Sequence, residues 1–247
     1  MFPKTKEFLT KEFLVNSYLS DFKGKLSIPA LFGLFQEVAW EHATLNSFGY
    51  EDLLKQGYFW ALSRIKVQVN RMPLWTETFN LTTWPSGTEG LFALRDYQIR
   101  DSNGNNLVSA SSSWLVVDIK TRRPQRLDTF KNVMPICTEI RATSGNAERI
   151  DLPAGSPIFS SNEVSKISDI DVNGHINNTK YVEWAVNSFP LSVYKEMNIR
   201  EVDVNFLAEG FCGEKFSVNN FNLEKDGHTI VVTREQDNRN SAIIRLK

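Results

Sequence analysis

The 247-residue sequence is poor in the residues that build disulfide frameworks and zinc sites, with 2 cysteines and 3 histidines. A disulfide framework needs more cysteines, and a zinc site needs several cysteine or histidine ligands brought together. No Gly-x-x-x-x-Gly-Lys or Gly-x-Gly-x-x-Gly phosphate loop occurs either. We therefore expect two free thiols, no metal and no cofactor.

Long apolar runs and an excess of one charge are also missing. An apolar run such as WLVV at residues 114–117 is far below the roughly 20 residues that cross a bilayer, so no membrane span is expected. The formal net charge of -1 gives no field that would attract nucleic acid. The first seven residues, MFPKTKE, resemble neither a signal peptide nor a transit sequence, which predicts a cytoplasmic protein.

The composition is that of a globular chain with one large or two small domains. Hydrophobic residues make up 41% and charged residues 23%, and the 17 phenylalanines and 6 tryptophans can fill a core.

The chain contains an internal repeat. DFKGKLS at residues 21–27 and DVNGHIN at residues 171–177 share the frame Asp-x-x-Gly-x-apolar-polar. Each copy leads into a segment of helical periodicity, residues 28–42 and 179–188. Pro29 suits the first turn of the first helix, and Asn177 or Asn178 can cap the second.

Matching strands follow each helix. IKVQV at 65–69 corresponds to VDVNF at 202–206, and TETF at 76–79 to GEKF at 213–216; hairpin turns follow at Asn103-Gly104 and Asp226-Gly227. This order predicts an α+β protein built as a tandem, or double, hotdog, in which each antiparallel sheet wraps a central helix. Two unrelated α+β domains are the alternative, which the repeat disfavours.

We expect three regions along the chain. Residues 1–123 form the N-terminal hotdog, 124–157 a linker mixing Pro, Gly, Ser and charged residues, and 158–247 the C-terminal hotdog.

The densest polar cluster lies in the second copy of the repeat. In an extended chain, residues 171, 173, 175 and 177 would share one face, and Val172 and Ile176 would point into the core. The first copy has Lys23 and Lys25 where the second has Asn173 and His175, so only the second half carries the full set.

This set has the chemistry of a hydrolase. A carboxylate, an amide and an imidazole can orient a water, take its proton and hold a carbonyl, and helix N–H groups can stabilise an oxyanion. Another carboxylate, Glu209, follows the second half's strand at 202–206. The absence of a Gly-x-Ser-x-Gly elbow argues against an α/β-hydrolase.

The segment DVNGHINNTKYVEW at residues 171–184 closely resembles the D-x-N-x-H-x-N-N-x-x-Y signature of acyl-acyl carrier protein thioesterases, and the resemblance is to the bacterial type. Further similar segments are FWALSR at 59–64, RMPLW at 71–75 and WLVVDIKTRRP at 114–124. The resemblance implies a double hotdog that hydrolyses the thioester of fatty acyl-acyl carrier protein, with catalytic residues at Asp171, Asn173, His175 and Glu209. Plant members carry a cysteine after that glutamate, whereas this chain has Gly210, which favours direct attack by water. Glu209 and Asp171 are both candidates for the general base.

The resemblance also implies that the first half holds the acyl tail, for which Leu34, Val38 and Trp60 are candidates. The expected partner is acyl carrier protein, which the basic run from Lys120 to Arg126 could contact, and a homodimer is possible. An acyl-CoA thioesterase and a non-catalytic acyl-binding lipid sensor are the alternatives.

Overall fold

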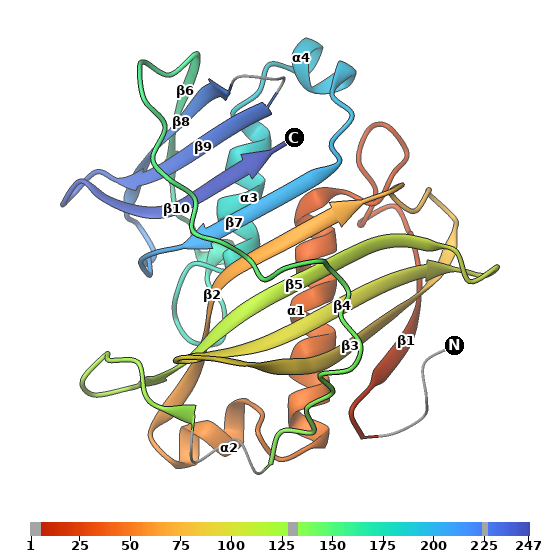
Figure 1. The fold of residues 1–247 in the computed structure, drawn as a ribbon. Coiled ribbons are helices and arrows are strands. Elements are labelled where there is room, and N and C mark those ends of the chain that lie inside the picture. The colour runs from red at the N-terminus through yellow and green to blue at the C-terminus, as the bar shows by residue number, and fades with distance from the viewer. Residues whose placement is uncertain (1–5, 128–132, 224–226) are drawn as a thin grey trace. The chain divides into compact units, whose positions relative to one another are not determined.

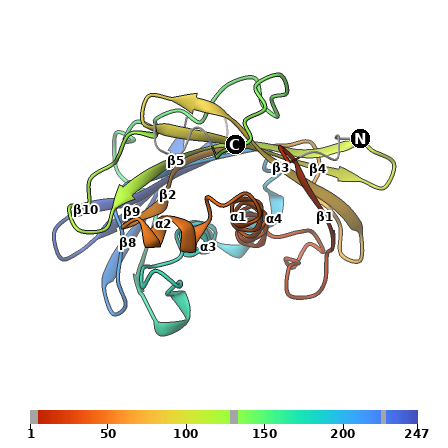
Figure 2. The same ribbon diagram turned by 90° about the horizontal axis from the view of Figure 1, so that it is seen from below.

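The two halves of the chain each fold as an antiparallel sheet with a helix on one face (Figures 1 and 2). The computed structural model describes residues 6–127, 133–223 and 227–247. It divides into two compact units, Met1–Ala147 and Glu148–Lys247. Asp226, predicted at a hairpin turn, lies outside the described residues.

In the first unit the strands follow the order β1-β3-β4-β5-β2. Their bounds are β1 Leu9–Leu14, β2 Tyr58–Val69, β3 Thr78–Glu89, β4 Phe92–Asp101 and β5 Asn106–Asp118. The long helix α1, Ile28–Leu45, lies on one face of this sheet, and the short α2, Tyr50–Lys55, follows it (Figure 2).

The second unit repeats this arrangement with the order β6-β8-β9-β10-β7. The strand bounds are β6 Phe159–Val164, β7 Glu201–Phe206, β8 Lys215–Leu223, β9 Gly227–Arg234 and β10 Arg239–Leu246. Helix α3, Asn178–Asn187, occupies the place of α1, with a 3-10 turn, Ile167–Asp169, before it and α4, Leu191–Glu196, after it. The matching orders confirm the tandem hotdog predicted from the repeat.

Both central helices begin where their capping residues predict. The Ala30 N–H donates to Ser27 Oγ at the start of α1, where Pro29 occupies the first turn. The Thr179 N–H donates to Asn177 Oδ1 at the start of α3, so Asn177 is the cap. The side chains that these helices bury against their sheets are mainly apolar: Leu31, Phe35 and Val38 in α1, and Tyr181, Val182 and Ala185 in α3.

Part of the predicted linker packs on the first unit, over the face of the sheet away from α1 (Figure 1). The Trp84 indole N–H donates to the Ile140 carbonyl, 3.0 Å away. The carboxylate of the fully buried Asp96 accepts from the Arg141 guanidinium at 3.0 Å and from the Ala142 N–H at 2.7 Å. Residues 128–132 of this segment lie outside the described residues.

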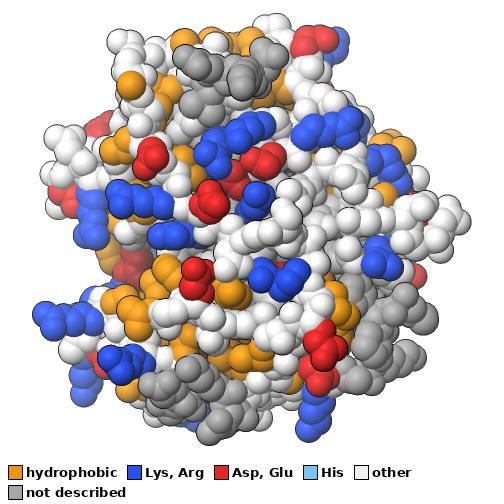
Figure 3. All heavy atoms as spheres, in the orientation of Figure 1, with side chains coloured by type: hydrophobic (Ala, Val, Ile, Leu, Met, Phe, Trp, Pro, Cys, Tyr) orange, Lys and Arg blue, Asp and Glu red, His pale blue; other side chains and the backbone are white. Residues whose placement is uncertain are grey.

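The next residues belong to the second unit. The Ile150 N–H donates to Asn205 Oδ1 at 2.8 Å, and the Asn205 amide donates to the Glu148 carbonyl at 2.9 Å. Ile150 packs on Val231 and Ile243. Acidic and basic side chains are interspersed on the face of the molecule drawn in Figure 3, in agreement with the near-zero net charge.

Candidate active site

The frame that the two copies of the repeat share folds, in the second copy, as a tight turn ahead of α3. The Asp171 N–H donates to the His175 carbonyl at 2.8 Å. Oδ1 of Asp171 accepts from the N–H groups of Asn173 at 2.8 Å and His175 at 3.3 Å. Gly174 has φ of +78°, a left-handed conformation that favours glycine. The carboxylate of Asp171 therefore holds the turn that presents Asn173 and His175.

This turn corrects one prediction from the sequence. Residues 171–174 are not extended, so they do not alternate between two faces, and Val172 is 85% exposed at the turn rather than buried. Ile176, past the turn, is buried as predicted.

The first unit contains the same turn with other side chains. The Asp21 N–H donates to the Lys25 carbonyl at 2.7 Å, and Oδ1 of Asp21 accepts from the N–H groups of Lys23 at 2.8 Å and Lys25 at 3.1 Å. Gly24 has φ of +66°. Asp21 and Asp171 thus perform the same backbone role, although the first turn carries lysines in place of the amide and the imidazole.

The loop after β7 brings Glu209 to the turn. The Ile176 N–H donates to the Gly210 carbonyl at 2.8 Å. Oε2 of Glu209 lies 3.8 Å from Nε2 of His175, and the side chains are 36% and 17% exposed. This separation exceeds a direct hydrogen bond, and both side chains are partly exposed. The edge of the His175 ring meets Phe211, with 5.3 Å between the ring centroids.

The corresponding loop of the first unit lacks the acid. The Leu26 N–H donates to the Pro73 carbonyl at 2.8 Å, as the Ile176 N–H does to Gly210, so Met72 occupies the position of Glu209. The structure therefore brings together all four predicted site residues of the second unit. Asn173, His175 and Glu209 are the three for which the first unit has different residue types.

Gly210, where the plant relatives were expected to have a cysteine, is packed too tightly for a side chain. A Cβ atom added there would lie 2.6 Å from Ile176 Cδ1, 2.7 Å from the Tyr181 hydroxyl and 3.0 Å from Phe216 Cζ. Cys212 lies farther along the loop and is exposed.

The start of α3 offers fewer free donors than the sequence suggests. Asn177 Oδ1 accepts from both the N–H and the hydroxyl of Thr179, and the Lys180 N–H donates to the Asn177 carbonyl. These two N–H groups are therefore already bonded.

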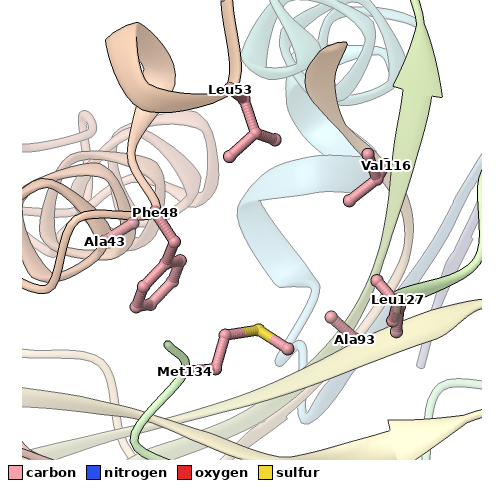
Figure 4. Close-up of a cluster of buried hydrophobic side chains, with 7 residues drawn as sticks. All are labelled: Ala43, Phe48, Leu53, Ala93, Val116, Leu127 and Met134. Atoms are coloured by element: carbon pink, nitrogen blue, oxygen red, sulfur yellow. The ribbon is translucent and has the colours of Figure 1, made fainter. Parts of the chain in front are cut away.

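The candidate acyl-binding residues all lie in the first unit. Leu34 and Val38 are buried one turn apart in α1. Trp60, in β2, is partly buried and donates from its indole to the Phe48 carbonyl at 2.9 Å. It packs against a cluster of buried side chains drawn in Figure 4: Ala43, Phe48, Leu53, Ala93, Val116, Leu127 and Met134.

Sequence reasoning missed two residues that support the site, Glu214 and Arg234. Glu214 accepts from the Phe211 N–H at 2.8 Å, as Glu77 does from the Leu74 N–H at the same distance in the first unit. The matched segments TETF and GEKF contain this signal. These matched segments give no signal for Arg234, because that residue lies in β9.

The described residues contain neither a cluster of metal ligands nor a membrane-spanning helix. No group of three or more His, Cys, Asp or Glu side chains in these residues is placed to hold a metal ion. None of the described helices is long and apolar enough to cross a membrane.

Two family models match the chain. The acyl-ACP thioesterase N-terminal domain matches residues 6–132, and the acyl-ACP thioesterase C-terminal domain matches residues 158–245. A palmitoyl-acyl carrier protein thioesterase of Arabidopsis thaliana is 28% identical over 221 residues, which are 82% of this chain and 52% of the relative. The chain thus spans about half the length of the curated relatives it matches.

Solved structures agree with this match. An acyl-ACP thioesterase from Bacteroides thetaiotaomicron superposes with a TM-score of 0.87 at 26% identity, covering 97% of each chain. A 12:0-ACP thioesterase from Umbellularia californica gives a TM-score of 0.89 at 21% identity, covering 100% of this chain and 98% of that one, which supports the fold. The chain belongs to the acyl-ACP thioesterase family.

Proposed function

We propose that the chain is an acyl-acyl carrier protein thioesterase, which uses water to cleave the thioester and release a free fatty acid. The observation that supports this proposal most directly is the 3.8 Å distance between Oε2 of Glu209 and Nε2 of His175. His175 shares its turn with Asn173, whereas the matching turn of the first unit carries lysines and the position of Glu209 is Met72. The names of the family and its relatives supply the substrate class.

In the proposed mechanism, Glu209 is the general base. A water between its carboxylate and the His175 ring loses a proton to Glu209, and the water oxygen attacks the thioester carbonyl carbon. The amide of Asn173 and the ring of His175 orient the water and the carbonyl. When the tetrahedral intermediate collapses, the carbon–sulfur bond breaks and the proton passes to the leaving thiolate. No metal or cofactor takes part.

Asp171 has a different role in this mechanism. Its Oδ1 accepts two N–H groups of the turn, and Asp21 does the same on a turn without an amide or imidazole. We assign Asp171 to holding the turn and Glu209 to taking the proton.

The first unit would hold the acyl tail. Leu34, Val38 and Trp60 are the residues proposed to contact it. The carrier protein is acidic, so the exposed basic run from Lys120 to Arg126 after β5 is a candidate contact. A cytoplasmic location and a homodimer complete the proposal.

The test is steady-state hydrolysis by purified protein of one acyl chain presented on acyl carrier protein and on CoA. Faster release from the carrier protein is expected. Faster release from CoA would indicate an acyl-CoA thioesterase. Binding of the two acyl substrates without hydrolysis would indicate a lipid sensor.

A further inference from the structure

We infer that Arg234 is a positioning residue, which fixes the backbone of Glu209 and so sets the distance between its carboxylate and His175. This inference rests on the proposed function of Glu209. Arg234 ends β9, and its guanidinium donates from Nη1 to the Glu209 carbonyl at 3.1 Å. Through this hydrogen bond Arg234 acts on the main chain of Glu209.

The guanidinium is itself held firmly. Its Nε and Nη2 donate to the two carboxylate oxygens of Asp237, at 3.0 and 2.8 Å. Its Nη1 also lies 3.4 Å from Oε1 of Glu214. These two carboxylates raise the pKa of Arg234, whose side chain is largely buried, so it stays a cation. A planar group held by three partners can fix the position of the carbonyl it donates to.

Four backbone groups at and after Glu209 are hydrogen-bonded. Arg234 holds the carbonyl of Glu209, and the Ile176 N–H holds the carbonyl of Gly210. Glu214, which Arg234 contacts, accepts from the N–H of Phe211, whose carbonyl accepts from Ser165 Oγ at 2.6 Å. The Glu209 peptide is thus tied on one side to the turn that carries His175 and on the other to β9.

The first unit has no equivalent of the hydrogen bond from Arg234 to the loop that carries Glu209, among the described residues. There Glu77 also accepts from a loop N–H, but its arginine partner is the local Arg71, which forms a two-bond pair with it at 2.7 Å. The residue in β4 that corresponds to Arg234 is Asp101, which pairs with Phe79 as Arg234 pairs with Phe216. An arginine that reaches across from the neighbouring strand therefore occurs in the unit with Glu209.

The test is a double-mutant cycle between Arg234→Met and Glu209→Gln, with Arg245→Met as the matched control. Arg245 forms an ion pair with the buried Asp203, 2.6 Å away in the same unit, so its loss costs stability without touching the site. We expect Arg234→Met to lower kcat by about 10- to 100-fold with KM within about twofold. In the Glu209→Gln background it should cost nothing further, because the group it positions is gone.

Two additional measurements keep the test decisive. Arg234→Lys retains the charge but lacks the planar fork that reaches Asp237, Glu214 and the Glu209 carbonyl together, so kcat should stay low in a protein that folds normally. The His175 ring resonances, simple to assign among 3 histidines, should move in Arg234→Met and not in Arg245→Met. This readout does not need turnover.

The outcomes separate the two proposals. Full activity of Glu209→Gln would overturn the proposed base and this inference with it. An inactive Glu209→Gln combined with equal losses in Arg234→Met and Arg245→Met, or with unmoved His175 resonances, would overturn the role of Arg234 alone.

Discussion

Asp21 and Asp171 occupy the same place in the same turn, and each accepts two backbone N–H groups with one carboxylate oxygen. One of them lies beside Lys25 and the other beside His175. The chain therefore carries the same turn twice, once with lysines and once with the residues proposed to be catalytic.

The Asp171→Asn variant should keep kcat within about tenfold of the wild type. Its amide oxygen can still accept both N–H groups, so the turn survives without the charge. Asp171→Ala and Asp21→Ala should each lower the free energy of unfolding by about 1–2 kcal/mol, because each removes the acceptor of two backbone hydrogen bonds. Chemical denaturation of both variants and turnover of Asp171→Asn check this. A loss in Asp171→Asn as large as in Glu209→Gln would instead make Asp171 the base.

The Glu209→Gln variant should lose kcat by about 100-fold or more, since a positioned general base contributes about 10²–10⁴ to the rate. Steady-state hydrolysis of acyl-acyl carrier protein measures the loss. Glu183→Gln, on α3 and paired with Lys180, is the control and should keep full activity. Retention of activity in Glu209→Gln would remove it from the role of base.

Gly210→Ala should destabilise the protein by about 1–3 kcal/mol, because the added Cβ enters space already filled by Ile176, Tyr181 and Phe216. Gly145→Ala is the control, since no atom lies within 4 Å of its added Cβ. Thermal or urea unfolding of both variants tests this. Equal stability of the two would show that the loop can shift to admit a side chain.

Val38→Trp should shift the released fatty acids toward shorter chains, because added bulk in α1 reduces the room for an acyl tail. Glu37→Trp, at an exposed neighbouring position, should leave the product profile unchanged. Gas chromatography of the free fatty acids from each variant gives the comparison. An unchanged profile in Val38→Trp would argue against the first unit as the acyl site.

Stability should fall in mild acid because of His42. Burial, together with the charge of Arg95, lowers its pKa from 6.5 to about 4 in the folded protein. The unfolded chain therefore binds a proton at higher pH than the folded one, so this stability is present above about pH 6.5 and is lost as the pH falls toward 4. Between pH 7 and 5 the wild type should lose about 2 kcal/mol more than His42→Gln. Urea titrations at both pH values measure the difference; parallel losses in the two proteins would contradict it.

The sequence predicted the tandem fold from local signals, and the four candidate site residues lie on segments that the structure brings together. Pro29 in the first turn of α1, the cap Asn177 and the repeated Asp-x-x-Gly frame are local signals, and they persist in the structure. The direction of Val172 could not be predicted by alternation, because Asp171 draws the backbone into a turn. Arg234 could not be predicted either, since its partners come from two separate loops, β7–β8 and β9–β10, and its first-unit equivalent is an acid.

Asp96 also bears on how the chain folds during synthesis. Its carboxylate is buried in β4, yet two of its donors, the Arg141 side chain and the Ala142 N–H, lie some 45 residues later in the sequence. Domains emerge from the ribosome from the N-terminus onward. A nascent first half that has all its strands but not Ala142 would bury a poorly compensated charge, so its fold is completed only when that later segment has left the ribosomal tunnel.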